Sequence, residues 1–173
     1  MGQYGRRPDR EGDTAQRLTQ KMAEPTLAAR VESLVAEFED LEPRERLELL
    51  LEYANNLPPL PAEYEAERLA GQHRVHECQT PVFLWVKLVD GRVQVDAWVA
   101  PEAPTVKGFV GIARELFSNL PPKEVGQVDT NLVQRLGLAD ALGMMRTRGL
   151  SAVLFYLRKN IEAQQALESP DAP

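Results

Sequence analysis

Residues 82–99, VFLWVKLVDGRVQVDAWV, carry the clearest structural pattern of the sequence. Aliphatic residues recur at every second position in both halves of this stretch, and Asp90 and Gly91 between the halves tolerate the positive φ angles of a two-residue turn. The pattern predicts an antiparallel hairpin with strands at 82–89 and 92–99. The facing pairs on one side of this hairpin are Leu88–Val93, Val86–Val95, Leu84–Ala97 and Val82–Val99. Because all of these side chains are apolar, that side must be buried.

The opposite side of the hairpin is mixed. It pairs Phe83 with Trp98 and Trp85 with Asp96, so we expect it to be partly covered as well. A short third strand near residues 74–75 would extend the sheet. A lone two-stranded hairpin is only marginally stable in water, and helices must therefore cover the buried face.

Helical spacing of apolar residues predicts those helices on both sides of the hairpin. Those before it are expected at 26–38 with Thr26 as the N-cap, at 43–54 and at 62–69 with Gly71 closing the last. Those after it are expected at 105–117, from Thr130 or Asn131 to Leu136, and from near Gly149 to Ile161. This order predicts an α+β domain at 25–168, with the helices packed on the small sheet.

Composition and charge exclude several functional classes. Residues 1–24 mix charges with no apolar period and are predicted to form a disordered tail. The net charge of −6 argues against nucleic acid or an anionic membrane as a partner, because phosphate contacts need a basic face. No stretch is long and apolar enough to span a bilayer, and the N-terminus has no run typical of a signal peptide. A cytoplasmic location is expected.

Cys78 is the single cysteine and the best candidate nucleophile. An intramolecular disulfide and a multi-cysteine metal site are both excluded by this count. Pro81 suits the start of a strand, so we expect Cys78 on a loop at one end of the sheet. Three other interpretations stay open for it: a small buried hydrophobe, a Cys–His pair with His76, and zinc binding with His76 and His73, which would need a fourth ligand.

The residues around Cys78 contain a recognisable order of motifs. Residues 73–84, HRVHECQTPVFL, place arginine-valine two residues before cysteine-glutamine, with valine and an aromatic residue further on. LPPLP at 57–61 precedes this stretch, VKG at 106–108 follows it, and Arg146 lies three residues before Gly149. In this order, over roughly residues 30–165, the sequence resembles the SufE family of sulfur-acceptor proteins. The departures from the family pattern are Glu77 for glycine, Thr80 for serine, Pro81 for a polar residue and Phe83 for tryptophan.

The resemblance implies a SufE- and IscU-like fold and a sulfur carrier that is not itself an enzyme. Cys78 would accept persulfide sulfur from a SufS-type cysteine desulfurase, stimulate that enzyme, and pass the sulfur to a SufB-like scaffold for iron–sulfur cluster assembly. The pyridoxal phosphate would belong to the desulfurase, and the carrier would need no cofactor or metal. Residues expected to support Cys78 or to bind the partner are Arg74, His76, Glu77, Gln79, Glu102, Lys107 and Arg146. The alternatives are a small Cys/His hydrolase and a non-catalytic adaptor with a buried cysteine.

Overall fold

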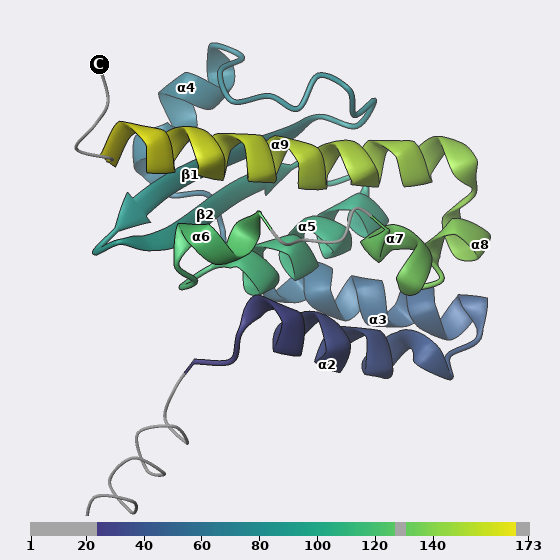
Figure 1. Ribbon diagram of the computed structural model, residues 1–173. Helices are drawn as coiled ribbons and strands as arrows, with labels where there is room; N and C mark the ends of the chain where they lie inside the picture. Colours follow the sequence, from purple (N-terminus) through teal and green to yellow (C-terminus); the bar gives the residue numbers. More distant parts are fainter. Residues whose placement is uncertain (1–23, 127–130, 169–173) are drawn as a thin grey trace, which may run out of the picture.

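The computed structural model describes residues 24–126 and 131–168 (Figure 1). Helices precede and follow one antiparallel hairpin, which confirms the predicted α+β class. The tail predicted at 1–24 lies outside the described residues except for Glu24, which forms an ion pair with Arg30 at 3.1 Å.

The predicted elements occur in the predicted order along the chain, and the short helices at 122–125 and 138–142 were not predicted. The elements up to the end of the hairpin are α2 (Leu27–Glu39), α3 (Pro43–Asn56), η1 (Ala62–Tyr64), α4 (Glu65–Leu69), β1 (Val82–Val89) and β2 (Arg92–Val99). Those after it are α5 (Pro104–Phe117), α6 (Pro122–Val125), α7 (Leu132–Arg135), α8 (Leu138–Leu142) and α9 (Met144–Glu168).

The hairpin has the predicted register. Leu88 pairs with Val93 next to the turn, and Val82 pairs with Val99 at the far end. Asp90 and Gly91 have φ angles of 51° and 70°, as a two-residue turn with both central residues in the left-handed region requires. This local turn sets the register, which in turn directs the apolar side toward the core.

The third strand does not form. It is reduced to a single isolated bridge between Arg74 and Phe83. His73 has a φ angle of 61°, which is not extended, and the amide of Cys78 donates back to the carbonyl of Val75 at 3.2 Å. The chain therefore turns away from β1 after one bridge and forms a loop.

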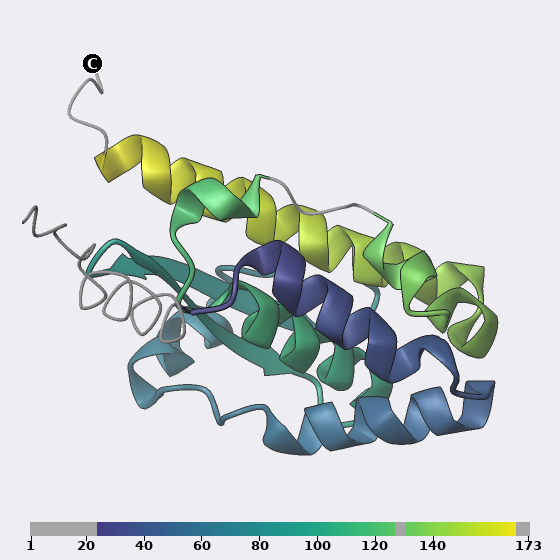
Figure 2. The same cartoon turned by 60° about the horizontal axis from the view of Figure 1, so that its bottom comes forward.

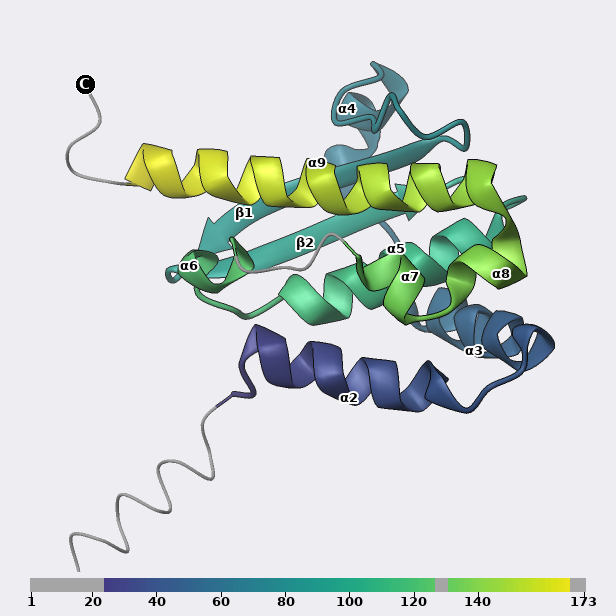
Figure 3. The same ribbon diagram turned by 45° about the vertical axis from the view of Figure 1, so that its right-hand side comes forward.

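Helices cover both sides of the hairpin. On the apolar side, α9 packs along β1 and α5 packs against β2 (Figures 1 and 3). The helices α2 and α3 pack on α5 and form a further layer, which Figure 2 shows from its outer side. On the mixed side, Tyr64 stacks on Trp85 with ring centroids 5.0 Å apart, and the guanidinium of Arg68 lies 4.5 Å from the ring centroid of Trp98. The predicted partial cover of the mixed side is confirmed.

The contact between α3 and α5 is close enough to need glycine. A Cβ atom at Gly108 would lie 2.0 Å from the carbonyl oxygen of Leu50, and one at Gly111 would lie 2.7 Å from that of Tyr53. The glycine of the VKG motif therefore has a packing role, since it lets the two backbones touch.

Two helix starts show where local sequence signals predict a boundary and where they do not. Thr26 caps α2 as predicted, with its Oγ1 accepting from the amide of Ala29 at 3.2 Å. The last helix, however, begins at Met144 and not near Gly149. Its first turn is exposed, with Met144 and Met145 at 76% and 69%, so no apolar stripe marks it in the sequence.

Candidate functional site

Cys78 lies on the loop that connects α4 to β1, at the end of the sheet, as predicted. Figure 3 shows this loop next to the N-terminal half of α9. The residue is only 4% exposed, and a Cβ atom at Gly149 of α9 would lie 3.4 Å from its sulfur. The thiol is therefore packed against a helix, where the glycine leaves room for it.

The loop is anchored at its two ends and lightly held between them. The amide of Val75 donates to Val82 at 2.9 Å, and the carbonyl of Pro81 accepts from Ala100 at 3.0 Å. Between these anchors, the amide of Cys78 donates to Val75, and its sulfur accepts from the backbone N–H of Thr80. Opening the tip of the loop would thus break few hydrogen bonds.

The surroundings of Cys78 favour the neutral thiol. Burial raises the pKa of Cys78 above its ordinary value, because the thiolate loses hydration there. The N–H of Thr80 and the positive charge of Arg74 act in the opposite direction and lower that pKa, but burial is the larger effect. With its loop closed, the protein therefore holds Cys78 protonated at neutral pH.

The thiol borders a pocket of about 430 Å³. Its lining residues are Glu77, Cys78, Gln79, Thr80, Val106, Met145, Arg146, Arg148 and Gly149. A neighbouring pocket of about 570 Å³ shares Gln79, Thr80, Val106 and Arg146 with it and adds Glu102. The two hollows thus adjoin along the N-terminal ends of α5 and α9.

The structure brings some of the predicted site residues to Cys78 and leaves others elsewhere. Glu77, Gln79 and Arg146 line its pocket, and Glu102 lines the neighbouring one. Lys107 lines a separate pocket beside residues 57–61. The functional roles expected for these residues stay predictions.

Neither histidine is part of the pocket at Cys78. His76 is exposed on the loop, and Nε2 of His73 lies 3.4 Å from Oε2 of Glu67, with its ring against Trp85. Within residues 24–126 and 131–168, no group of three or more His, Cys, Asp or Glu side chains could hold a metal ion. The pairing of Cys78 with a histidine and the zinc site both lack geometric support.

Sequence reasoning missed Met145 and Arg148, which line the pocket from α9. Both are exposed, and the sequence places them in a segment without apolar periodicity. Tyr156, further along α9, also interacts electrostatically with the loop. Burial raises the pKa of Tyr156, and the negative charge of Glu77 on the loop raises it further. In the sequence, a Met-Met pair next to two arginines is the feature that distinguishes this segment.

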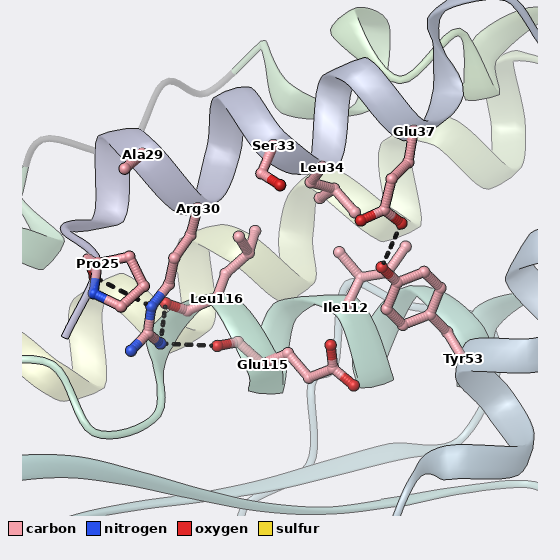
Figure 4. Close-up of a pocket in the computed structure, with 10 residues that line it drawn as sticks. All are labelled: Pro25, Ala29, Arg30, Ser33, Leu34, Glu37, Tyr53, Ile112, Glu115 and Leu116. Carbon is pink, nitrogen blue, oxygen red and sulfur yellow. Dashed lines mark hydrogen bonds between the residues drawn. The ribbon is translucent and has the colours of Figure 1, made fainter. Parts of the chain in front are cut away.

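Another pocket, of about 260 Å³, lies between α2, α3 and α5 (Figure 4). Some of its polar groups hold these helices together. Nη1 of Arg30 donates to the carbonyl oxygens of Glu115 and Ser118 at 2.9 and 2.7 Å, and the hydroxyl of Tyr53 donates to Glu37 at 3.0 Å. The pocket contains no cysteine or histidine, which makes the hollow beside Cys78 the stronger candidate site.

Comparison with known proteins assigns this arrangement to a family. The family model described as SufE, an Fe–S metabolism associated domain, matches residues 32–161. The chain belongs to the SufE family. This membership confirms the resemblance carried by the motifs around Cys78 and associates the protein with iron–sulfur metabolism.

Individual SufE relatives match most of the chain. An uncharacterised SufE-like protein of Mycobacterium tuberculosis is 33% identical over 140 residues, which span 80% of this chain and 96% of the relative. A SufE-like protein of Synechocystis is 28% identical over 149 residues, spanning 86% and 90%. The solution structure of a hypothetical protein from Thermus thermophilus matches with a TM-score of 0.68 at 34% identity, covering 79% of this chain and 96% of that one. In the part of the chain that the structure describes, no helix has the length and apolar character needed to cross a membrane.

Proposed function

We propose that this SufE-family protein is a sulfur carrier that acts through Cys78. It takes sulfur from a SufS-type cysteine desulfurase in the cytoplasm, stimulates that enzyme, and delivers the sulfur to a SufB-like scaffold of iron–sulfur cluster assembly. The observation that supports this most is the placement of the sequence's single cysteine on a lightly held loop beside an open pocket. The carrier uses no cofactor, and the pyridoxal phosphate belongs to the desulfurase.

The transfer is an exchange between sulfur atoms and needs no further reactant. The thiolate of Cys78 attacks the terminal sulfur of the desulfurase persulfide. A new S–S bond forms on Cys78, the S–S bond of the donor breaks, and the donor cysteine leaves as a thiolate with the electron pair. The number of S–S bonds is unchanged, so no oxidant or reductant is consumed.

The burial of Cys78 gives this carrier two states. In the closed state the thiol is packed beside Gly149 and its pKa is raised, which keeps it unreactive. Opening of the loop tip breaks the hydrogen bonds of Cys78 to Val75 and Thr80, at a net cost of about 0.5–1.5 kcal/mol each. Hydration of the sulfur then lowers its pKa toward that of an ordinary thiol. Binding of the desulfurase supplies the free energy for this opening.

The surface around the pocket provides contacts for the partner. Met145, Arg146 and Arg148 are exposed at its rim on α9, and Glu102 borders the adjoining hollow. Exposed methionines adapt to varied apolar surfaces, and arginines add charge-assisted hydrogen bonds. Lys107 would contact the partner only through its separate pocket beside residues 57–61.

Intact-mass analysis tests the carrier role directly. The protein is mixed with a pyridoxal-phosphate-loaded desulfurase and L-cysteine, and we expect one or more added sulfur atoms, located on Cys78 by peptide mapping. Omission of L-cysteine is the control, and Cys78→Ser should gain no sulfur and should not stimulate the desulfurase. Absence of sulfur on the wild type, or full stimulation by Cys78→Ser, would overturn the proposal.

A non-catalytic adaptor is the second candidate, and the 4% exposure of Cys78 favours it. The two functions differ in what the partner does to the thiol. In a carrier, Cys78 should be alkylated slowly when the protein is alone, and faster when a desulfurase is added without L-cysteine. An adaptor should stay slow in both mixtures and react fast only after denaturation.

A further inference from the structure

Arg74 carries a buried donor that has no acceptor. Its Nε atom is inaccessible to solvent and makes no hydrogen bond within the described residues. No carboxylate of the described chain forms an ion pair with Arg74 either, although other half-buried arginines have partners. Arg46 and Arg114, for example, donate to backbone carbonyl oxygens. Buried polar groups are nearly always paired, so an unpaired nitrogen on a charged side chain calls for an explanation.

The backbone ties Arg74 to the sheet at the start of the loop that carries Cys78. Arg74 forms the bridge to Phe83 of β1, so its main chain is tied to the sheet. The next residue, Val75, is fully buried, and its carbonyl oxygen accepts a hydrogen bond from the amide of Cys78 at 3.2 Å. The backbone of Arg74 therefore lies in the anchored start of the loop that carries Cys78.

Arg74 is also the charged residue whose field reaches the sulfur. Its positive charge lowers the pKa of Cys78, against the larger effect of burial, which raises it. The charged groups that share the pocket with the thiol are Glu77 on the loop and Arg146 and Arg148 on α9. Both α9 arginines are exposed, so water and salt screen them more strongly than the half-buried Arg74.

We propose that Arg74 is the counter-ion reserved for the negative charge on Cys78, first as the thiolate that attacks and then as the persulfide anion. The unpaired Nε–H is the donor kept for that anion. Arginine suits this position because it stays charged when half-buried and presents its donors in a rigid plane. The persulfide half of this inference rests on the proposed carrier function, whereas the thiolate half does not.

The pH profile of thiol alkylation tests Arg74 without any partner. Full-length wild type, Arg74→Met and Arg74→Lys are alkylated with iodoacetamide from about pH 6 to about pH 11, a range that brackets ordinary and raised thiol pKa values. Loss of an opposite charge close to a thiol should raise its pKa. At about pH 8, that shift reduces the thiolate fraction, and with it the alkylation rate, by roughly tenfold. Arg74→Lys should keep most of the wild-type rate.

Matched variants separate this charge effect from a structural one. Arg114→Met also removes a half-buried arginine, which lies on α5 and whose Nε donates to the carbonyl oxygen of Val95 on β2 at 3.0 Å. This variant should leave the alkylation profile of Cys78 unchanged. Thermal unfolding checks that each variant is folded, and Arg74→Gln serves as a second neutral variant. A wild-type profile in folded Arg74→Met and Arg74→Gln would overturn the proposal, as would an equal shift in Arg114→Met.

Loading with inorganic polysulfide extends the test to the persulfide. We expect Arg74→Met to retain several-fold less added sulfur than the wild type, by intact mass, after the excess reagent is removed. If polysulfide loads the wild type and the alkylation shift appears, but a desulfurase transfers nothing, the carrier function fails while the role of Arg74 stands. If the desulfurase loads Arg74→Met and the wild type equally, and both hold the sulfur equally long, the role of Arg74 fails while the carrier function stands.

Discussion

Replacement of Gly108 by alanine probes the contact on which the helical layer depends. The new Cβ would lie 2.0 Å from the carbonyl oxygen of Leu50 and 2.7 Å from its carbonyl carbon. Both atoms belong to the backbone of α3, so no side chain can rotate away. The helices would have to separate by about 1 Å to bring the contact to the shortest distance that packed atoms tolerate.

The loss of folding stability expected for Gly108→Ala is the balance of opposing effects. Overpacking costs about 1–3 kcal/mol where some relaxation exists, and a backbone clash this short belongs at or beyond the upper end. Separation of the helices also weakens dispersion contacts along the whole α3–α5 interface. Alanine regains about 1 kcal/mol through its better helix propensity. We expect a net loss of at least about 2 kcal/mol, or roughly 4–8 °C in the midpoint of thermal unfolding for a chain of this size.

Thermal unfolding followed by circular dichroism measures this loss. Gly126→Ala is the matched control, because a Cβ there meets nothing within 4 Å and the φ angle of Gly126 is −60°. The control should unfold at the wild-type temperature or slightly above it. If Gly108→Ala proved as stable as the control, the two backbones would not be in contact and the reasoning would be wrong.

Two further substitutions have expected outcomes. Gly149→Leu fills the space beside the sulfur of Cys78. It should therefore expel the thiol from its buried position and speed the alkylation of Cys78 several-fold. An unchanged alkylation rate would contradict the packing of the loop on α9. Partial desolvation chiefly raises the pKa of Glu115 in the folded protein, although the residue lies at the surface. The stability gained from its protonated form is therefore present below the unfolded pKa and is lost as the pH rises through the folded pKa. Glu115→Gln should therefore raise the urea midpoint at neutral pH and have little effect at about pH 3, and equal gains at both pH values would argue against this.

The hairpin and most helices could be predicted because their causes are local. Asp90 and Gly91 set the turn, the turn sets the register, and the alternation of apolar residues selects the buried side. The cap at Thr26 and the left-handed Gly71 likewise act within one helical turn. The start of α9 was missed for the same reason, since its exposed first turn carries no apolar stripe around Met144.

The sequence alone singled out Cys78 as the candidate nucleophile, because residue type and neighbouring motifs are local properties of the chain. Which side chains meet that sulfur was decided by the packing of α9 against the loop, through contacts between residues about 70 positions apart. That packing brought Arg148 to the pocket, left Lys107 outside it, and buried the thiol. Burial and the resulting pKa depend on all neighbours in space, and only the folded chain brings those neighbours together.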